Sequence, residues 1–218
     1  MMKTFPNSLV KVAEDSIRNS IISGKLALGQ KVTEQELAEQ FNISKTPIRE
    51  ALQTLQREGL VEVRPRKGTF IFTFTEESIT SLRGVRNALE QFALREAVRR
   101  DRTRLLRDIG ENLQRSDILI EKNDIPSYTK IDREFHSFFF KYAQNLYLDK
   151  AYSAIGIHLQ VLWRLAVDHL YQMDNVIKSV ALHKTIANHI LEDEIDQACE
   201  SLAYHNNRIS ILNFPSII

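Results

Sequence analysis

The chain has 218 residues, of which 43% are hydrophobic and 26% charged, and its formal net charge is +1. These values are ordinary for a globular protein, and the length suffices for one small and one larger domain. No apolar run approaches the roughly 18 to 20 residues of a membrane-spanning helix, the N-terminus lacks the apolar core of a signal peptide, and the single cysteine excludes an internal disulfide framework. We therefore expect a cytoplasmic protein with no membrane partner.

Positive charge is concentrated in the N-terminal third. Residues 1–74 contain 11 Lys and Arg against 8 Asp and Glu, whereas the remainder contains 18 against 20. This asymmetry favours a nucleic acid as the partner of the first part. An apolar period over residues 8–23 predicts a first helix, which Gly24 ends.

A short second helix is predicted over residues 34–41, where Leu37 and Phe41 are spaced for one buried face. Thr33, with Glu36 three residues later, forms a capping box at its start. Asn42 suits the left-handed conformation that ends a helix. A turn and another helix are therefore expected next.

The third predicted helix begins after Ser44, a favourable N-cap, with Pro47 in its first turn. Its buried stripe consists of Ile48, Ala51, Leu52 and Leu55. The exposed face carries Lys45, Thr46, Arg49, Gln53 and Gln56. Such a helix can place backbone amides and charges against phosphates while Arg49 reaches base edges in the major groove.

Residues 60–63 and 69–72 alternate like two strands, and the segment between them, Arg-Pro-Arg-Lys-Gly at 64–68, predicts a basic hairpin tip. A charge run on its own is usually a solvated face. Here the caps, the turn, the apolar period and the cationic tip agree over residues 32–68. The sequence therefore predicts a winged helix-turn-helix that binds double-stranded DNA.

The segments 21–26, 44–52, 58–61 and 65–70 resemble the GntR family of bacterial transcription regulators. In that family, the recognition helix and the wing tip contact operator DNA. The resemblance implies DNA contacts at Gln35, Ser44, Lys45, Thr46, Arg49, Arg66, Lys67 and Gly68. Gln35 stands where the family often has Arg, which implies a weaker phosphate contact or a neutral donor.

Residues 1–74 are thus expected to form the DNA-binding domain, and residues 75–218 an all-helical domain for ligand binding, metal binding and dimerisation. Amphipathic segments predict helices at about 76–100, 102–122, 125–143, 146–171, 174–191 and 194–212. Short connections favour an antiparallel six-helix bundle in a mostly α protein. The aromatic run at 135–142 and Cys199 are expected in its core.

Four residues of this domain are spaced to form one cluster. Asp132 and His136 are four apart on one predicted helix and share a face. His183 and His205 are equidistant from residue 194, in the turn that joins the last two helices, so an antiparallel hairpin would bring them together. Three nitrogens and one oxygen suit a divalent metal such as Zn, Ni or Mn. On spacing alone, separately hydrogen-bonded histidines with a solvated Asp132 remain an equal alternative.

The same positions resemble the FCD domain, the effector-binding domain of the FadR subfamily, in which an Asp and three His bind a metal. The resemblance implies that Asp132, His136, His183 and His205 are the ligands. A metal with open positions attracts a small carboxylate effector, which an arginine would clamp. Arg86, which with Glu90 resembles the family's Arg-x-x-x-Glu pattern, and Arg164 are the candidates, although an ion pair is the alternative for both. The histidines at 158, 169 and 189 match no ligand position.

The leading hypothesis is a homodimeric transcription regulator that places two recognition helices in successive major grooves of a pseudo-palindromic operator and responds to a small organic acid. A metal-dependent hydrolase with an appended winged-helix module is the alternative enzyme hypothesis. Catalysis needs a general base near the metal, and Glu134 is expected to point away from the ligand face, so we expect no enzyme. A regulator with a purely structural metal is the third hypothesis.

Overall fold

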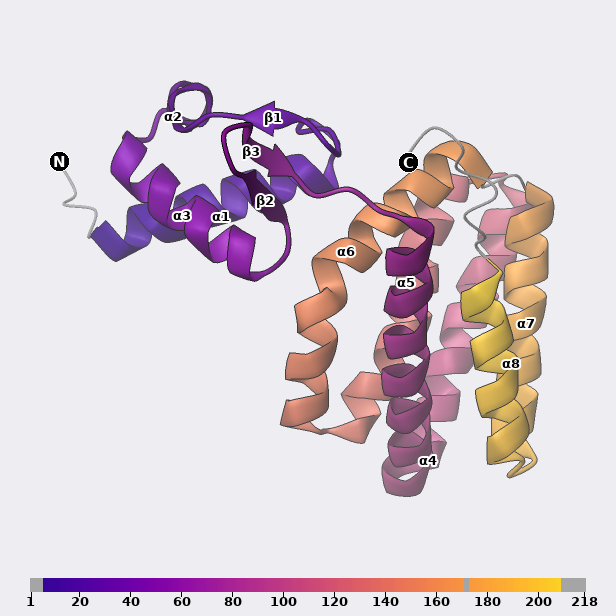
Figure 1. Ribbon diagram of the computed structural model, residues 1–218. Coiled ribbons are helices and arrows are strands. Elements are labelled where there is room, and N and C mark those ends of the chain that lie inside the picture. Colours follow the sequence, from indigo (N-terminus) through magenta and orange to yellow (C-terminus); the bar gives the residue numbers. More distant parts are fainter. Residues whose placement is uncertain (1–5, 171–172, 209–218) are drawn as a thin grey trace, which may run out of the picture. The chain divides into compact units, whose positions relative to one another are not determined.

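The computed structural model describes residues 6–170 and 173–208, and the described chain is mostly helical (Figure 1). It divides into two compact units. Among the described residues, one unit contains those up to Thr75 together with Gly156–Arg164, and the other contains Glu76–Ile155 together with those that follow Arg164. Among the described residues, no helix has both the length and the apolar character needed to cross a membrane.

The first unit is a winged helix-turn-helix, as predicted. Its elements are α1 (Pro6–Ile22), β1 (Lys31–Val32), α2 (Glu34–Phe41), α3 (Lys45–Arg57), β2 (Val61–Arg64) and β3 (Gly68–Ile71). The three strands form an antiparallel sheet in the order β1-β3-β2. Helices α1 and α3 pack against each other over a core that includes Ala13, Ile17, Ile21, Ile48, Leu55, Leu60 and Ile71. Strand β1 was not predicted, because two residues are too few to show alternation.

The predicted helix signals in this unit are confirmed with one exception. The Thr33 hydroxyl accepts from the Glu36 amide at 3.1 Å, and the Glu36 carboxylate accepts from the Thr33 amide at 2.9 Å, so the capping box is present. Asn42 is left-handed, with φ 53° and ψ 44°. Ser44 occupies the N-cap position of α3, but its side chain makes no capping hydrogen bond there.

The second unit contains α4 (Glu76–Glu121), α5 (Ile125–Ala143), α7 (Met173–Leu191), α8 (Ile195–Asn207) and the two ends of α6 (Leu146–Leu170), whose middle part, Gly156–Arg164, groups with the first unit. Helix α4 is interrupted at Asp101, where φ is −158° and ψ is 67°. The Asp101 carboxylate accepts from the Arg104 amide at 3.1 Å and so caps the second segment. The six predicted helical segments are therefore present, while residues 171 and 209–212 of two predicted helices lie outside the described residues.

The core of this unit lies where α4, α5, α7 and α8 meet. The aromatic run of α5 is buried there, as predicted, through Phe135, Phe138, Phe139, Phe140 and Tyr142. Cys199 on α8 is also buried, 2% exposed. Left-handed residues terminate three helices of this unit: Asn123 (φ 53°) follows α4, Gln144 (φ 46°) follows α5 and Asp193 (φ 66°) follows α7.

Asp108 joins α4 to α5. It is 8% exposed, and it accepts from the Lys141 ammonium at 2.7 Å and from the Tyr142 hydroxyl at 2.6 Å. The adjacent Arg107 guanidinium donates to it at 2.9 Å. These donors, Lys141 first, hold the pKa of Asp108 below its usual value. The carboxylate is therefore ionised and stabilises the folded state at neutral pH.

We expect Asp108→Asn to lower the free energy of unfolding by about 1–3 kcal/mol at pH 7, because it removes charge-assisted hydrogen bonds. Since the folded pKa is depressed, this contribution is complete above the unfolded value of about 4 and is lost as the pH falls below it. Urea denaturation at pH 7 and pH 3 measures the change. The control, Asp117→Asn, breaks an exposed pair with Lys184 and should cost less than about 1 kcal/mol. A difference that does not change with pH would contradict the assignment.

Candidate metal centre and nucleic-acid interface

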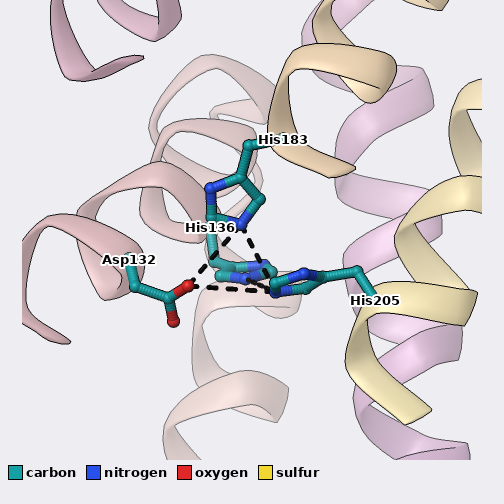
Figure 2. A group of neighbouring side chains, drawn as sticks. All are labelled: Asp132, His136, His183 and His205. Atoms are coloured by element: carbon teal, nitrogen blue, oxygen red, sulfur yellow. Dashed lines mark hydrogen bonds and ion pairs between the residues drawn. The ribbon is translucent and has the colours of Figure 1, made fainter. Parts of the chain in front are cut away.

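Four buried side chains converge inside the helical unit. Asp132 and His136 project from α5, His183 from α7 and His205 from α8 (Figure 2). Each offers one ligand atom, and these atoms all lie within 4.8 Å of one another. The structure therefore brings together all four residues that the sequence predicted.

Helix geometry explains why they meet. Asp132 and His136 are one turn apart on α5, so both face the same side. Helix α7 ends at Leu191 and α8 begins at Ile195, so His183 and His205 lie at similar distances, eight and ten residues, from the connection. Their Nε2 atoms lie 3.3 Å apart.

The distances between the candidate ligand atoms fit a shared metal ion. The Nε2 atoms of His136 and His205 are 3.2 Å apart, and Asp132 Oδ1 lies 3.6 Å from His183 Nε2 and 3.9 Å from His205 Nε2. Ligand atoms bonded to one metal at about 2.0–2.2 Å lie roughly 3.0–3.6 Å from their neighbours. The cluster is close to this spacing without any rearrangement of the helices.

The protonation states of the cluster histidines are also compatible with a bound metal cation. Glu90 accepts from His136 Nδ1 at 2.9 Å, so the Nε2 atom of His136 presents a lone pair to the cluster. Burial lowers the pKa of His183 to about 3, and burial together with the neighbouring histidines and Arg86 lowers the pKa of His205 well below its usual value. The two rings are therefore neutral at pH 7, as metal ligation requires.

The remaining ring nitrogens give a second observation. The Nδ1 atoms of His183 and His205 are buried and have no hydrogen-bond partner in the described part of the chain. His205 Nε2 faces both of the other Nε2 atoms but carries at most one hydrogen. Hydrogen bonds within the cluster thus leave Nε2 lone pairs unmatched, and a divalent cation bound by the Nε2 atoms would satisfy them, whereas it would not supply a partner for the two Nδ1 atoms.

Glu90 is the central acceptor beside this cluster and is fully buried. Its two oxygens accept from Arg86 Nε at 2.7 Å, Tyr152 Oη at 2.9 Å, His136 Nδ1 at 2.9 Å and Asn206 Nδ2 at 2.9 Å. Burial opposes the charged form, but Arg86 and His136 outweigh it, so the pKa of Glu90 lies below its usual value. An ionised carboxylate therefore links α4, α5, α6 and α8.

Two residues that support Asp132 were not predicted. The Tyr128 hydroxyl and the Ser179 hydroxyl donate to Asp132 Oδ1 at 3.2 Å and 3.3 Å. Each lies four residues before a cluster member, Tyr128 before Asp132 and Ser179 before His183. That one-turn spacing was a signal in the sequence that could have identified both.

The two predicted effector arginines lie in different places. Arg86 is 4% exposed and forms the buried ion pair with Glu90, and its charge also acts on Asp132. Arg164 groups with the other compact unit, and its effector contact stays a prediction. Glu134, the residue weighed as a base, pairs with Arg115 and Asn112 instead of facing the cluster.

The predicted DNA-binding residues are exposed in the first unit, apart from Gly68, which is half-buried. Ser44, Lys45, Thr46 and Arg49 lie on the first turns of α3. The turn between β2 and β3 is closed by a hydrogen bond from the Lys67 amide to the carbonyl of Arg64 at 3.0 Å. The wing tip consists of Arg66 (φ 61°), Lys67 and Gly68 (φ 113°). A groove of about 280 Å³ between α3 and the strands is lined by Glu34, Arg49, Leu52, Gln53, Gln56, Val63 and Thr69.

Two of the residues predicted to contact DNA form hydrogen bonds with other side chains of the protein. The Arg49 guanidinium donates two hydrogen bonds of 2.8 Å to Glu34, and the Gln35 amide donates to Glu39. A further cation was missed: Lys31 on β1 crosses the wing, since a Cβ added at Gly68 would lie 2.8 Å from Lys31 Cε. Lys31 reaches the wing because β1 pairs with β3, and the sequence did not reveal β1.

We expect Glu90→Gln to lower the free energy of unfolding by about 3–5 kcal/mol, because it leaves the Arg86 charge buried without its carboxylate. The control is Glu96→Gln on the same helix, where the partner Arg99 is largely exposed and the expected cost is at most about 1 kcal/mol. Urea denaturation of the full chain compares them. Equal losses of unfolding free energy in the two variants would show that the buried Glu90 stabilises the bundle no more than an exposed glutamate does.

Comparison with known proteins gives consistent matches in both units. Residues 9–71 match the model of bacterial regulatory proteins of the gntR family, and residues 82–208 match that of the FCD domain. An uncharacterised HTH-type transcriptional regulator in the TAR-I ttuE-ttuC' intergenic region of Agrobacterium vitis is 34% identical over 133 residues, which cover 58% of this chain and 76% of that protein. The gluconate operon transcriptional repressor of Bacillus subtilis is 31% identical over 127 residues, 58% of this chain and 51% of the repressor.

The fold has a solved counterpart. Escherichia coli McbR/YncC aligns with a TM-score of 0.71 and 18% identity, over 92% of this chain and 94% of that chain. The two family matches cover the winged helix-turn-helix and the helical unit that carries the cluster, and the relatives are transcription regulators rather than enzymes. The chain is a DNA-binding transcription regulator that belongs to the GntR family and carries an FCD domain.

Proposed function

We propose that this regulator binds a pseudo-palindromic operator as a homodimer, and that a small organic acid held at a divalent metal modulates that binding. The observation that carries the proposal is the buried cluster of Asp132, His136, His183 and His205 with its unmatched lone pairs. Zn, Ni and Mn are the metals that such a donor set suits. The protein would act in the cytoplasm, where its DNA target is found.

The chain's own residues prepare the cluster for a cation. Glu90 fixes the ring of His136 through its Nδ1 hydrogen, and the hydroxyls of Tyr128 and Ser179 fix Asp132. A bound divalent ion would supply a Lewis acid with open positions for a carboxylate oxygen. Arg86 acts electrostatically on Asp132, His183 and His205, but its own charge is matched by Glu90, so the metal itself would supply the attraction for an anion.

On the DNA side, Lys45, Thr46 and the wing cations would bind phosphates while Arg49 reads a base edge. Arg49 must first leave Glu34. Because Arg49 is 60% exposed and Glu34 33% exposed, solvent screens their pair and little free energy is lost when it breaks. A bidentate contact to a guanine discriminates by about 1–3 kcal/mol, so the exchange favours DNA.

Regulation requires that the acid bind the DNA-competent and DNA-incompetent states with different affinities. Two-fold symmetry of a homodimer would match the symmetry of the operator. One relative represses a gluconate operon, so sugar acids are the first compounds to screen.

We expect Arg49→Ala to weaken binding to an operator selected from a randomised duplex pool by roughly 10–100-fold, as loss of a base contact predicts. The control is Arg57→Ala at the far end of α3, where Arg57 bonds to Thr54, and it should change affinity little. Fluorescence anisotropy at one fixed salt concentration measures both. Wild-type affinity in Arg49→Ala would exclude this use of α3.

Elemental analysis of protein purified without chelator or polyhistidine tag should find about one divalent metal per chain in the wild type and none in His183→Ala. His189→Ala is the matched control, because His189 lies on the same helix but bonds to Glu194, outside the cluster. It should retain the metal. Wild-type protein without metal, even after reconstitution, would refute the metal part of the proposal.

The same variants test the coupling. An active acid should shift operator affinity in wild type and His189→Ala by roughly 5–150-fold, the usual range of allosteric coupling, and should have no effect on His183→Ala. If the wild type holds metal but no acid alters operator binding, the metal is structural and the regulatory part of the proposal fails.

A further inference from the structure

Arg83 lies on the same face of α4 as Glu90, the residue that bonds to His136 of the cluster. The residues Ile79, Arg83, Arg86 and Glu90 are spaced four, three and four apart, which places them along one side of the helix. Ile79, Arg86 and Glu90 are buried, and Arg83 is half-buried between them. Arg83 is thus one turn beyond Arg86 in the direction away from Glu90.

The guanidinium of Arg83 lacks the partners that its neighbours have. Its Nε and Nη2 atoms are buried and make no hydrogen bond, and within the described residues no carboxylate forms an ion pair with it. Other arginines of α4 are paired, Arg99 with Glu96 and Arg104 with Asp101. Buried N–H groups of a cation are costly when they are unsatisfied, so an acceptor for Arg83 is missing from the described chain.

The charges around Arg83 favour an anion. The Arg86 charge is matched by the ionised Glu90, whereas the Arg83 charge is not matched. Burial, and then repulsion from Arg86, lower the pKa of Arg83, yet an arginine remains protonated in proteins. The planar guanidinium binds a carboxylate or a phosphate group through two parallel hydrogen bonds.

Arg83 is also within reach of a ligand at the cluster. Glu90, which bonds to His136, lies seven residues along the same face, and a rise of 1.5 Å per residue places their backbones about 10 Å apart. A long arginine side chain and a short acid can span this separation. Arg86 acts electrostatically on both Arg83 and His183.

We propose that the effector is a dianionic organic acid, with one carboxylate at the metal cluster and a second anionic group, carboxylate or phosphate, bound by Arg83. This inference rests on the proposed function and specifies its ligand class. Arg83 is then the residue that distinguishes a dianion from a monoanion of similar size.

Isothermal titration calorimetry on the full-length, metal-loaded protein tests the proposal with two matched pairs of acids: succinate against butyrate, and 3-phosphoglycerate against glycerate. In the wild type, at least one of the acids with two anionic groups should bind about tenfold or more tighter than its partner with one anionic group, as one additional charge-assisted contact predicts. The pair with the larger ratio identifies a carboxylate or a phosphate as the second group. Arg83→Gln should abolish the preference, and Arg83→Lys should keep part of it.

The matched control is Arg99→Gln, an exposed arginine of the same helix, which should leave the preference intact. Thermal unfolding without ligand separates binding from structure: Arg83→Gln should unfold at or above the wild-type temperature, because it removes an unmatched charge, whereas a structural arginine would be destabilised by the change. If Arg83→Gln does not fold, Arg83→Lys is measured instead, and a reduced preference for the acid with two anionic groups supports the proposal, whereas an unchanged preference contradicts it.

Equal affinities within both pairs, or a preference that survives in Arg83→Gln, would overturn this inference while leaving the proposed function standing. Binding of none of the four acids, at a metal-loaded cluster and with no effect of any screened acid on operator affinity, would overturn both together.

Discussion

The ionised carboxylate of Glu90 is the constraint on which the helical unit depends. It is fully buried and has four hydrogen-bond donors, from Arg86, His136, Tyr152 and Asn206, so α4, α5, α6 and α8 all contribute to its solvation. A buried charge is tolerated only when such donors replace water. The bond to His136 also decides which ring nitrogen faces the cluster. Holding the bundle together and preparing a metal ligand are therefore two effects of one carboxylate.

Two arginine–glutamate ion pairs, Arg86–Glu90 and Arg49–Glu34, differ in strength because one is buried and the other is exposed. Arg86 and Glu90 are 5% and 0% exposed in their side chains, so separating them leaves a buried charge and costs about 3–5 kcal/mol. Arg49 and Glu34 are 60% and 33% exposed, so solvent screens their pair and little free energy is lost when it breaks. The first pair is a fixed part of the bundle. The second keeps the Arg49 side chain ordered on the surface of α3 yet can exchange for a stronger acceptor.

The fold and the cluster could be predicted from the sequence where the determining pattern is local. A spacing of four residues placed Asp132 and His136 on one face, and the symmetry of a hairpin paired the other two histidines. Contacts between distant segments had no such pattern: Glu90 lies 46 residues from His136, and Glu34 lies 15 residues from Arg49 on another helix. Strand β1 is defined only by its pairing with β3. Periodicity describes one element at a time, so contacts that depend on how elements pack cannot be derived from it.

Gln144, at the end of α5, has consequences for how this domain can vary. Its φ of 46° and ψ of 46° are left-handed, and its amide donates to the carbonyl of Phe140 at 3.2 Å. A residue with a Cβ costs about 1–2 kcal/mol in this conformation, and a glycine does not. The helix that carries Asp132 and His136 thus ends in a conformation unfavourable for glutamine. Replacing Gln144, two turns beyond His136, by glycine would therefore remove this conformational cost and raise the stability of the folded state, without moving the side chain of Asp132 or His136.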